Sequence, residues 1–253
     1  MNRRAFLNAA ALGTAASLAR GNAVRSSGTR NRIVAVAFDG FAIFDPRPVG
    51  AVAEALFPGK GADLMSIWRT RQFEYSWLRT LTGNYVNFLQ VTRDALTFAC
   101  ASLQLELRAA SRARLLQAFL QLQPWPDARM TLQRLHAAGV RMAFLSNFTA
   151  QMLDANIEAS GIGEFFEARL STDRVAAFKP DPRSYQMAVD HFGLPREAIA
   201  FVAFGGWDAA GASGFGFPVY WSNRLSQPPE ELGAAGARVE TGLDSLPAFV
   251  AAH

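Results

Sequence analysis

Cysteine and histidine, which bind most protein-held transition metals, are scarce in this chain. Cys100 is the only cysteine among 253 residues, which excludes an intrachain disulfide and a site built from several thiolates. The three histidines, His136, His191 and His253, are scattered, and none has a partner at metal-ligand spacing. We therefore expect neither a zinc centre nor a Ser-His-Asp triad.

Acidic residues are absent from the N-terminal part of the chain. None precedes Asp39, whereas six arginines do. The formal net charge is +4, and removing residues 1–23, which hold three of these arginines, leaves +1. The high pI of about 9.7 is therefore largely a property of the N-terminal segment, and we expect no nucleic-acid partner.

The same segment has the pattern of an export signal. Arg3 and Arg4 precede an uncharged apolar stretch over residues 5–19, and small residues at positions 21 and 23 suit a cleavage site. The paired arginines and their neighbours resemble the twin-arginine export motif. We predict an export signal over residues 1–23, a polar leader over 24–31 and a periplasmic protein.

An uncleaved N-terminal helix or a membrane anchor is the alternative interpretation of this segment. The apolar stretch is short and rich in Ala and Gly, so it would span a bilayer poorly. No other segment resembles a transmembrane helix, and we expect no stable membrane anchor.

The rest of the chain has the composition of a globular enzyme, since 50% of all residues are hydrophobic and 18% are charged. One strand-like run precedes a helical block, and helices then alternate with strands, which is typical of a parallel sheet. We predict an α/β fold: a doubly wound parallel-sheet (Rossmann-like) core over residues 32–46 and 123–253, with an inserted helical cap subdomain over 47–122. The expected strands are 33–38, 141–145, 165–170, 198–204 and 219–221, and the expected helices are 62–80, 85–103, 111–122, 127–138, 149–160, 182–192 and 208–214.

Polar side chains follow the expected strands. Asp39 ends the first strand, Ser146 and Asn147 end the second, Lys179 lies a little beyond the third, and Asp208 follows the fourth. In an open α/β sheet, ligands bind in the crevice outside the carboxyl ends of the strands. The pattern therefore indicates one catalytic site that contains two carboxylates and an amine.

Longer motifs spread over residues 32–250 carry a family resemblance. They are Phe38-Asp39, residues 68–79 (WRTRQFEYSWLR), Leu145-Ser146-Asn147, residues 178–185 (FKPDPRSY), residues 207–212 (WDAAGA), Gly216-Phe217-Pro218 and residues 221–224 (WSNR). In this order they resemble the L-2-haloacid dehalogenases of the haloacid dehalogenase superfamily.

The resemblance implies a covalent mechanism for small (S)-2-haloalkanoic acids. Asp39 would displace halide from C2 with inversion, and water would hydrolyse the aspartyl ester to release an (R)-2-hydroxyalkanoic acid. Lys179 would keep the carboxylate ionised and in place, since a nearby cation lowers the pKa of an acid. Asp208 would orient Lys179 and help to activate the water. The family uses no cofactor or metal ion and is often dimeric.

The resemblance also assigns substrate-binding residues. Arg69 would bind the carboxylate or the halide, because a guanidinium group suits a small anion. Ser146 and Asn147 would bind the carboxylate and the leaving halide, with Tyr185 near the lysine. An apolar wall would surround the alkyl group and the halide, and its residues would be Phe41, Phe73, Phe88 and Trp207.

Two segments depart from the family pattern. The family has a Gly-Thr pair shortly after the nucleophile, whereas residues 40–44 here read GFAIF, which is one residue shorter and lacks the hydroxyl. Before Trp207 the family places Ser-Asn-Ala, and here Phe204, Gly205 and Gly206 stand instead. Polar groups that would support Asp39 and the hydrolytic water are therefore missing.

Two other functions fit parts of the pattern. A Mg²⁺-dependent phosphatase of the same superfamily needs a second acid two residues after the nucleophile, and that position is Phe41. No acid stands beside Asp208 either. The missing polar groups agree better with the other alternative, a catalytically weakened, exported carboxylate-binding homologue.

Overall fold

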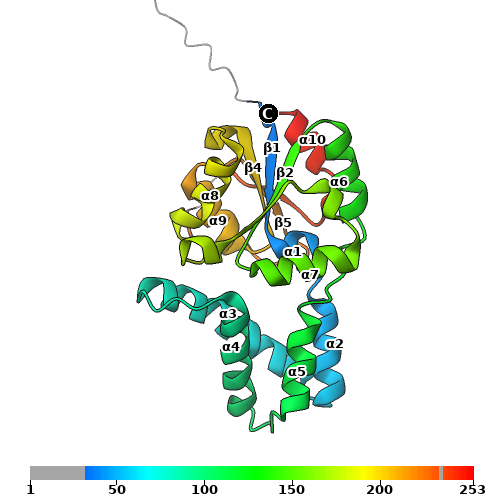
Figure 1. Ribbon diagram of the computed structural model, residues 1–253, viewed down its shortest axis with the longest axis vertical. Coiled ribbons are helices and arrows are strands. Elements are labelled where there is room, and N and C mark those ends of the chain that lie inside the picture. Colours follow the sequence, from blue (N-terminus) through cyan, green and yellow to red (C-terminus); the bar gives the residue numbers. More distant parts are fainter. Residues whose placement is uncertain (1–31, 234–235) are drawn as a thin grey trace, which may run out of the picture. The chain divides into compact units, whose positions relative to one another are not determined.

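The computed structural model describes residues 32–233 and 236–253, so the predicted signal and leader lie outside the described residues. Six parallel strands form one sheet in the order β3-β2-β1-β4-β5-β6 (Figure 1). The chain runs outward from β1 in both directions, which makes β1 the switch point of the sheet. The predicted doubly wound α/β fold is confirmed. The strands are β1 Ala35–Phe38, β2 Arg141–Ser146, β3 Ala168–Ser171, β4 Ile199–Ala203, β5 Val219–Ser222 and β6 Arg238–Glu240.

Strand β1 is apolar throughout because both of its faces are covered. Val36 and Phe38 belong to one buried cluster, and Ala35 and Ala37 belong to another on the opposite face. Helices α6 (Ala128–Ala137), α7 (Ala150–Ser160) and α10 (Leu246–Ala251) contribute to the first cluster. Helices α8 (Pro182–Phe192) and α9 (Gly206–Phe215) contribute to the second (Figure 1).

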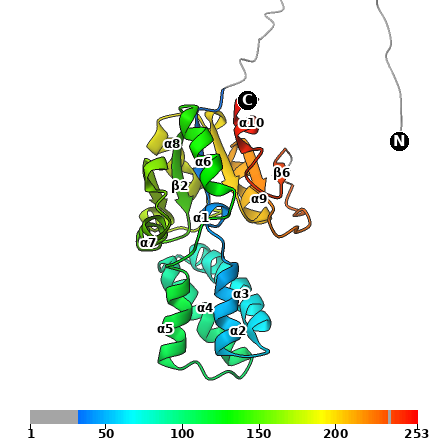
Figure 2. The ribbon, with the colours of Figure 1, turned by 90° about the vertical axis from the view of Figure 1, so that its right-hand side faces the viewer.

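Five helices lie in the sequence between β1 and α6. They are α1 Gly40–Ile43, α2 Arg47–Leu56, α3 Gly61–Leu81, α4 Phe88–Ser102 and α5 Ala109–Ala118. Helices α2 to α5 pack beside one another (Figure 2). Between α3 and α4, the indole of Trp68 donates to the carbonyl of Thr92 at 2.8 Å, and Gln72 donates to the Thr92 hydroxyl at 2.7 Å. These buried bonds fix the position of α3 relative to α4.

Several expected boundaries were wrong. The apolar run predicted as a strand over 165–170 begins with a 3₁₀ turn, Gly163–Phe165, and the strand starts only at Ala168. Phe165 and Phe166 are apolar because they are buried in the core, not because they belong to the sheet. The helix expected over 111–122 is Ala109–Ala118. Within the part of the chain that the structure describes, no helix is long and apolar enough to cross a bilayer.

Candidate active site

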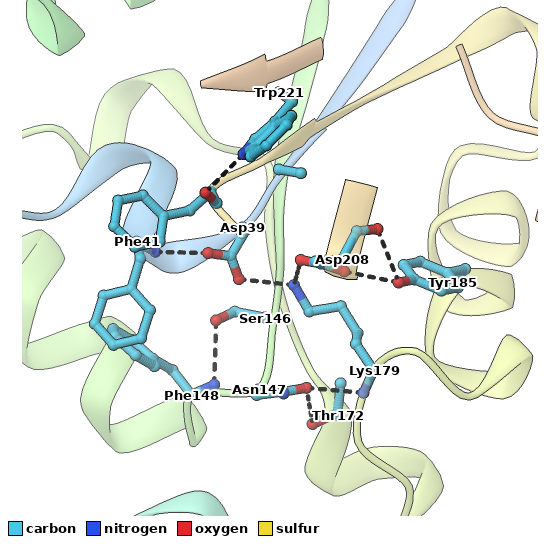
Figure 3. A network of polar contacts seen from close by, with 12 residues as sticks. Asp39, Phe41, Ser146, Asn147, Phe148, Thr172, Lys179, Tyr185, Asp208 and Trp221 are labelled. Atoms are coloured by element: carbon cyan, nitrogen blue, oxygen red, sulfur yellow. Dashed lines mark hydrogen bonds and ion pairs between the residues drawn. The ribbon is translucent and has the colours of Figure 1, made fainter. Parts of the chain in front are cut away.

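Asp39 lies at the carboxyl end of β1, where the chain turns into the short helix α1. Its Oδ2 accepts a hydrogen bond from the backbone N–H of Phe41 at 2.9 Å, so the carboxylate caps this helix. A Cβ atom on Gly40 would lie 2.8 Å from the hydroxyl of Ser146, so only glycine lets the turn approach β2 this closely. Asp39 is 8% exposed, and its second oxygen, Oδ1, faces Lys179 (Figure 3).

Lys179 is completely buried between two carboxylates. Its Nζ atom lies 2.7 Å from Oδ1 of Asp39 and 2.6 Å from Oδ2 of Asp208 (Figure 3). Burial lowers the pKa of the ammonium group, but attraction to Asp208 and Asp39 outweighs burial and holds the pKa above its usual value. The lysine therefore carries its charge between the two acids.

Asp208 lies in the first turn of α9 and is 1% exposed. Its Oδ1 accepts a hydrogen bond from the hydroxyl of Tyr185 at 2.7 Å, and its Oδ2 accepts one from Lys179. Burial raises the pKa of Asp208 to about 6; Lys179 opposes this shift and the negative charge of Asp39 adds to it. Tyr185 is itself fully buried behind Asp208, with which it shares this bond.

Ser146 and Asn147 end β2 beside the carboxylate. The Ser146 hydroxyl accepts a bond from the backbone N–H of Phe148 at 3.1 Å. The side-chain oxygen of Asn147 accepts one from the backbone N–H of Lys179 at 3.0 Å, which joins the lysine loop to β2 (Figure 3). Neither residue caps the helix that follows, because Thr149 does so.

The carboxylate faces a very small cavity. Its free volume is about 10 Å³, which is about the space of one water molecule. Asp39, Ser146, Asn147 and Asp208 supply its polar lining. Its remaining lining contains all four aromatic residues predicted as an apolar wall, together with Phe148, which the sequence did not single out, and Phe204, which departs from the family pattern. These residues are Phe41, Phe73, Phe88, Trp207, Phe148, Phe204 and Gly205.

Arg69 lies in a different cavity. It projects from α3 into a space of about 350 Å³ and does not line the small cavity around Asp39. Its guanidinium carbon lies 5.4 Å from the ring centre of Phe204 and 6.0 Å from that of Phe73. Burial alone lowers the pKa of Arg69. The structure thus brings Asp39, Lys179 and Asp208 together and places Arg69 beyond an aromatic partition.

This arrangement suits nucleophilic chemistry by the Asp39 carboxylate. The ammonium group of Lys179 occupies the space between Asp39 and Asp208, where a cation shared by the two carboxylates would have to lie. The described residues contain no group of three or more His, Cys, Asp or Glu side chains able to hold a metal ion. A carboxylate that is paired with a buried cation and surrounded by apolar rings can attack an electrophilic carbon.

Known proteins share both the sequence and the fold. The chain matches the model of the haloacid dehalogenase-like hydrolases over residues 20–216. It is 42% identical over 202 residues to (S)-2-haloacid dehalogenase from Pseudomonas sp. (strain YL). The matched region covers 79% of this chain and 87% of that protein. It is 38% identical over 203 residues to haloacetate dehalogenase H-2 from Moraxella sp. (strain B). That match covers 80% of this chain and 91% of the relative.

The fold also matches a solved structure with a bound ligand. This is L-2-haloacid dehalogenase from Xanthobacter autotrophicus with chloropropionic acid covalently bound. The two chains are 34% identical, the match covers 86% of this chain and 98% of that one, and the TM-score is 0.80.

Proposed function

Because this chain belongs to the L-2-haloacid dehalogenases within the haloacid dehalogenase-like hydrolases, we propose that it hydrolyses small (S)-2-haloalkanoic acids to (R)-2-hydroxyalkanoic acids and halide. The observation that carries this proposal is the contact of 2.7 Å between Asp39 and the buried Lys179 at the edge of an apolar cavity. The acid covalently bound in the Xanthobacter relative agrees with a covalent intermediate.

In the first step, an oxygen of Asp39 attacks C2 of the substrate from the side opposite the halogen. A carbon–oxygen bond forms, and the carbon–halogen bond breaks with its electron pair leaving on the halide, so the configuration at C2 inverts. Lys179 and the N–H of Phe41 hold the carboxylate in place for this attack. The rings around the cavity exclude water, which strengthens these contacts.

In the second step, water attacks the carboxyl carbon of the Asp39 ester. The bond between this carbon and the Asp39 oxygen that attacked C2 breaks, and the (R)-2-hydroxyalkanoate leaves with that oxygen, which takes up the remaining proton of the attacking water. Asp208 in its ionised form takes up a proton of the water as the new bond forms, either directly or through Lys179, with which it shares a hydrogen bond of 2.6 Å. One oxygen of Asp39 in the regenerated enzyme then comes from water.

Halide release in the presence of a metal chelator tests this function. The wild type should release bromide from bromoacetate and (S)-2-bromopropionate, and Asp39→Asn should abolish release. A single turnover in ¹⁸O-labelled water should label the peptide that contains Asp39, whereas attack of water on C2 would label the product instead. Phosphate release from p-nitrophenyl phosphate with Mg²⁺, without halide release, would favour the phosphatase alternative.

We also propose that the protein is exported to the periplasm. The paired Arg3 and Arg4 and the uncharged apolar residues 5–19 support this proposal. Folded export fits a catalytic site assembled from distant segments, because twin-arginine transport carries folded proteins. A homodimer stays a prediction, which light scattering of the purified protein would check.

A further inference from the structure

Two cavities of very different size share one aromatic partition. The rings of Phe41, Phe73 and Phe204 line both the cavity of about 10 Å³ and the cavity of about 350 Å³. Asp39 lines only the small cavity, and Arg69 lines only the large one. The space on the Asp39 side is therefore limited by these rings and not by a lack of room in the protein.

Phe204 is the firmly held part of the partition. It is 6% exposed, and its ring lies 5.8 Å from that of Phe41 and stacks at 6.3 Å on that of Trp125. Its backbone carbonyl accepts a hydrogen bond from the indole of Trp221 at 3.0 Å. Phe73, on α3, is only partly buried. Admission of a substrate is therefore easier by movement of Phe73 than by movement of Phe204.

The neighbouring Gly205 narrows the small cavity further. A Cβ atom at this position would lie 2.8 Å from Nε1 of Trp207, so the indole ring is folded over the glycine. A side chain at position 205 would force this ring away. The ring of Phe204 and the indole of Trp207, which lies over Gly205, thus both line the cavity beside the carboxylate of Asp39.

We propose that Phe204 is a specificity-determining residue that favours two-carbon haloacetates over longer 2-haloalkanoates. This inference rests on the proposed dehalogenase function and narrows its substrate class. A haloacetate has only hydrogen atoms on C2 besides its halogen and carboxylate. Each longer 2-haloalkanoate adds an alkyl group, and the ring of Phe204 separates that group from the larger cavity.

Comparing chain lengths in one assay tests the partition. The wild type should have a kcat/KM at least about 10-fold higher for bromoacetate than for (S)-2-bromohexanoate, since each methylene is worth about 10-fold or more in a closed pocket. Phe204→Ala, which opens the small cavity to the large one, should raise the hexanoate-to-acetate ratio at least about 10-fold. Phe165→Ala removes a buried ring that lines neither cavity and should leave the ratio unchanged.

Equal kcat/KM values for the two lengths in the wild type, or an unchanged ratio in Phe204→Ala, would overturn the inference while halide release still supported the dehalogenase function. If no haloacid reacts, the proposed function fails, and calorimetric binding of unreactive acetate and hexanoate tests the partition alone. Phe204→Ala should then raise the affinity for hexanoate relative to the affinity for acetate by at least about 10-fold. An unchanged ratio of the two affinities would disprove the role of Phe204 in specificity.

Discussion

The side chains of Lys179 and Asp39, 140 residues apart in the chain, meet with 2.7 Å between Nζ and Oδ1. Lys179→Met would leave the carboxylates of Asp39 and Asp208 buried without their shared cation, and Asp39 would lose the contact that holds it in place for attack. We expect kcat/KM for halide release to fall by about 100-fold or more. Urea denaturation should show a loss of about 3–5 kcal/mol in the free energy of unfolding, as for other broken buried ion pairs.

Lys60 offers the matched control, because it is the only other lysine in the chain. Its side chain is 54% exposed, and its nearest acid, Asp63, lies 3.9 Å away. Lys60→Met should change the stability by less than about 1 kcal/mol and leave activity intact. Equal effects of the two substitutions would contradict a special role of Lys179.

The raised pKa of Asp208 predicts an acidic limb in the pH–rate profile. The water-attack step needs ionised Asp208, and its pKa is about 6, so kcat should fall as the pH drops below about 6. Asp208→Asn should lower kcat and remove this limb. A wild-type rate that stays constant down to pH 4.5 or so, well below the cited pKa, would show that Asp208 is not the base.

The raised pKa of Asp208 also makes the free energy of unfolding depend on pH. Activity falls as the pH drops, whereas the contribution of this group to stability falls as the pH rises. Since the folded pKa of about 6 lies above the usual value of 3.8, the folded protein holds the proton of Asp208 more tightly than the unfolded chain. The contribution of this group to stability is therefore fully present below pH 3.8 and is lost as the pH rises through about 6. Urea denaturation of wild type and Asp208→Asn between pH 3.8 and about 6 isolates the contribution of Asp208 to the free energy of unfolding.

Tyr185 should tune this titration. Its hydroxyl donates to Oδ1 of Asp208 at 2.7 Å, and this bond lowers the pKa of the carboxyl group. Tyr185→Phe should therefore move the acidic limb of the pH–rate profile to higher pH. Tyr220→Phe is the control, because Tyr220 also donates a hydrogen bond, to the carbonyl of Gly242 at 2.8 Å, but lies away from Asp208. A limb that stays in place in Tyr185→Phe would contradict the prediction.

Much of the candidate active site could be predicted from the sequence for a simple topological reason. Asp39, Ser146 and Asp208 follow strands that are neighbours in the sheet, and parallel strands bring their carboxyl ends to one edge. The fold class could be predicted because buried strands alternate with helices. Boundaries such as the start of β3 at Ala168 could not, because Phe165 and Phe166 have the same apolar character in the core as in a strand.

Contacts between distant side chains were not predictable from the pattern. Nothing in the sequence indicates that Tyr185 bonds to Asp208 or that Phe148 lines the cavity, since these contacts depend on how the helices pack on the sheet. Arg69 shows the same limit. Its motif placed it near substrate, but only the structure shows that aromatic rings separate it from Asp39.

Arg69 should contribute to substrate binding when the partition moves. Its charge is largely desolvated, and a hydrogen bond from a charged group to a carboxylate is worth about 1.5–3 kcal/mol. Arg69→Gln should therefore raise KM for bromoacetate by about 10-fold or more. Arg71→Gln is the control, because Arg71 pairs with Glu74 at 2.7 Å and its side chain is 38% exposed. An unchanged KM in Arg69→Gln would exclude this residue from substrate binding.

Export depends on the paired arginines if the N-terminal segment is a twin-arginine signal. Replacing both Arg3 and Arg4 by lysine keeps the positive charge but removes the motif, so uncleaved protein should accumulate in the cytoplasm. Immunoblots of cell fractions would show this, and N-terminal sequencing of the periplasmic wild type should begin at Val24. Lysine at Arg25 and Arg30, beyond the predicted cleavage site, is the matched control and should leave export unchanged. Equal export of both double variants would show that general positive charge, and not the arginine pair, directs the protein.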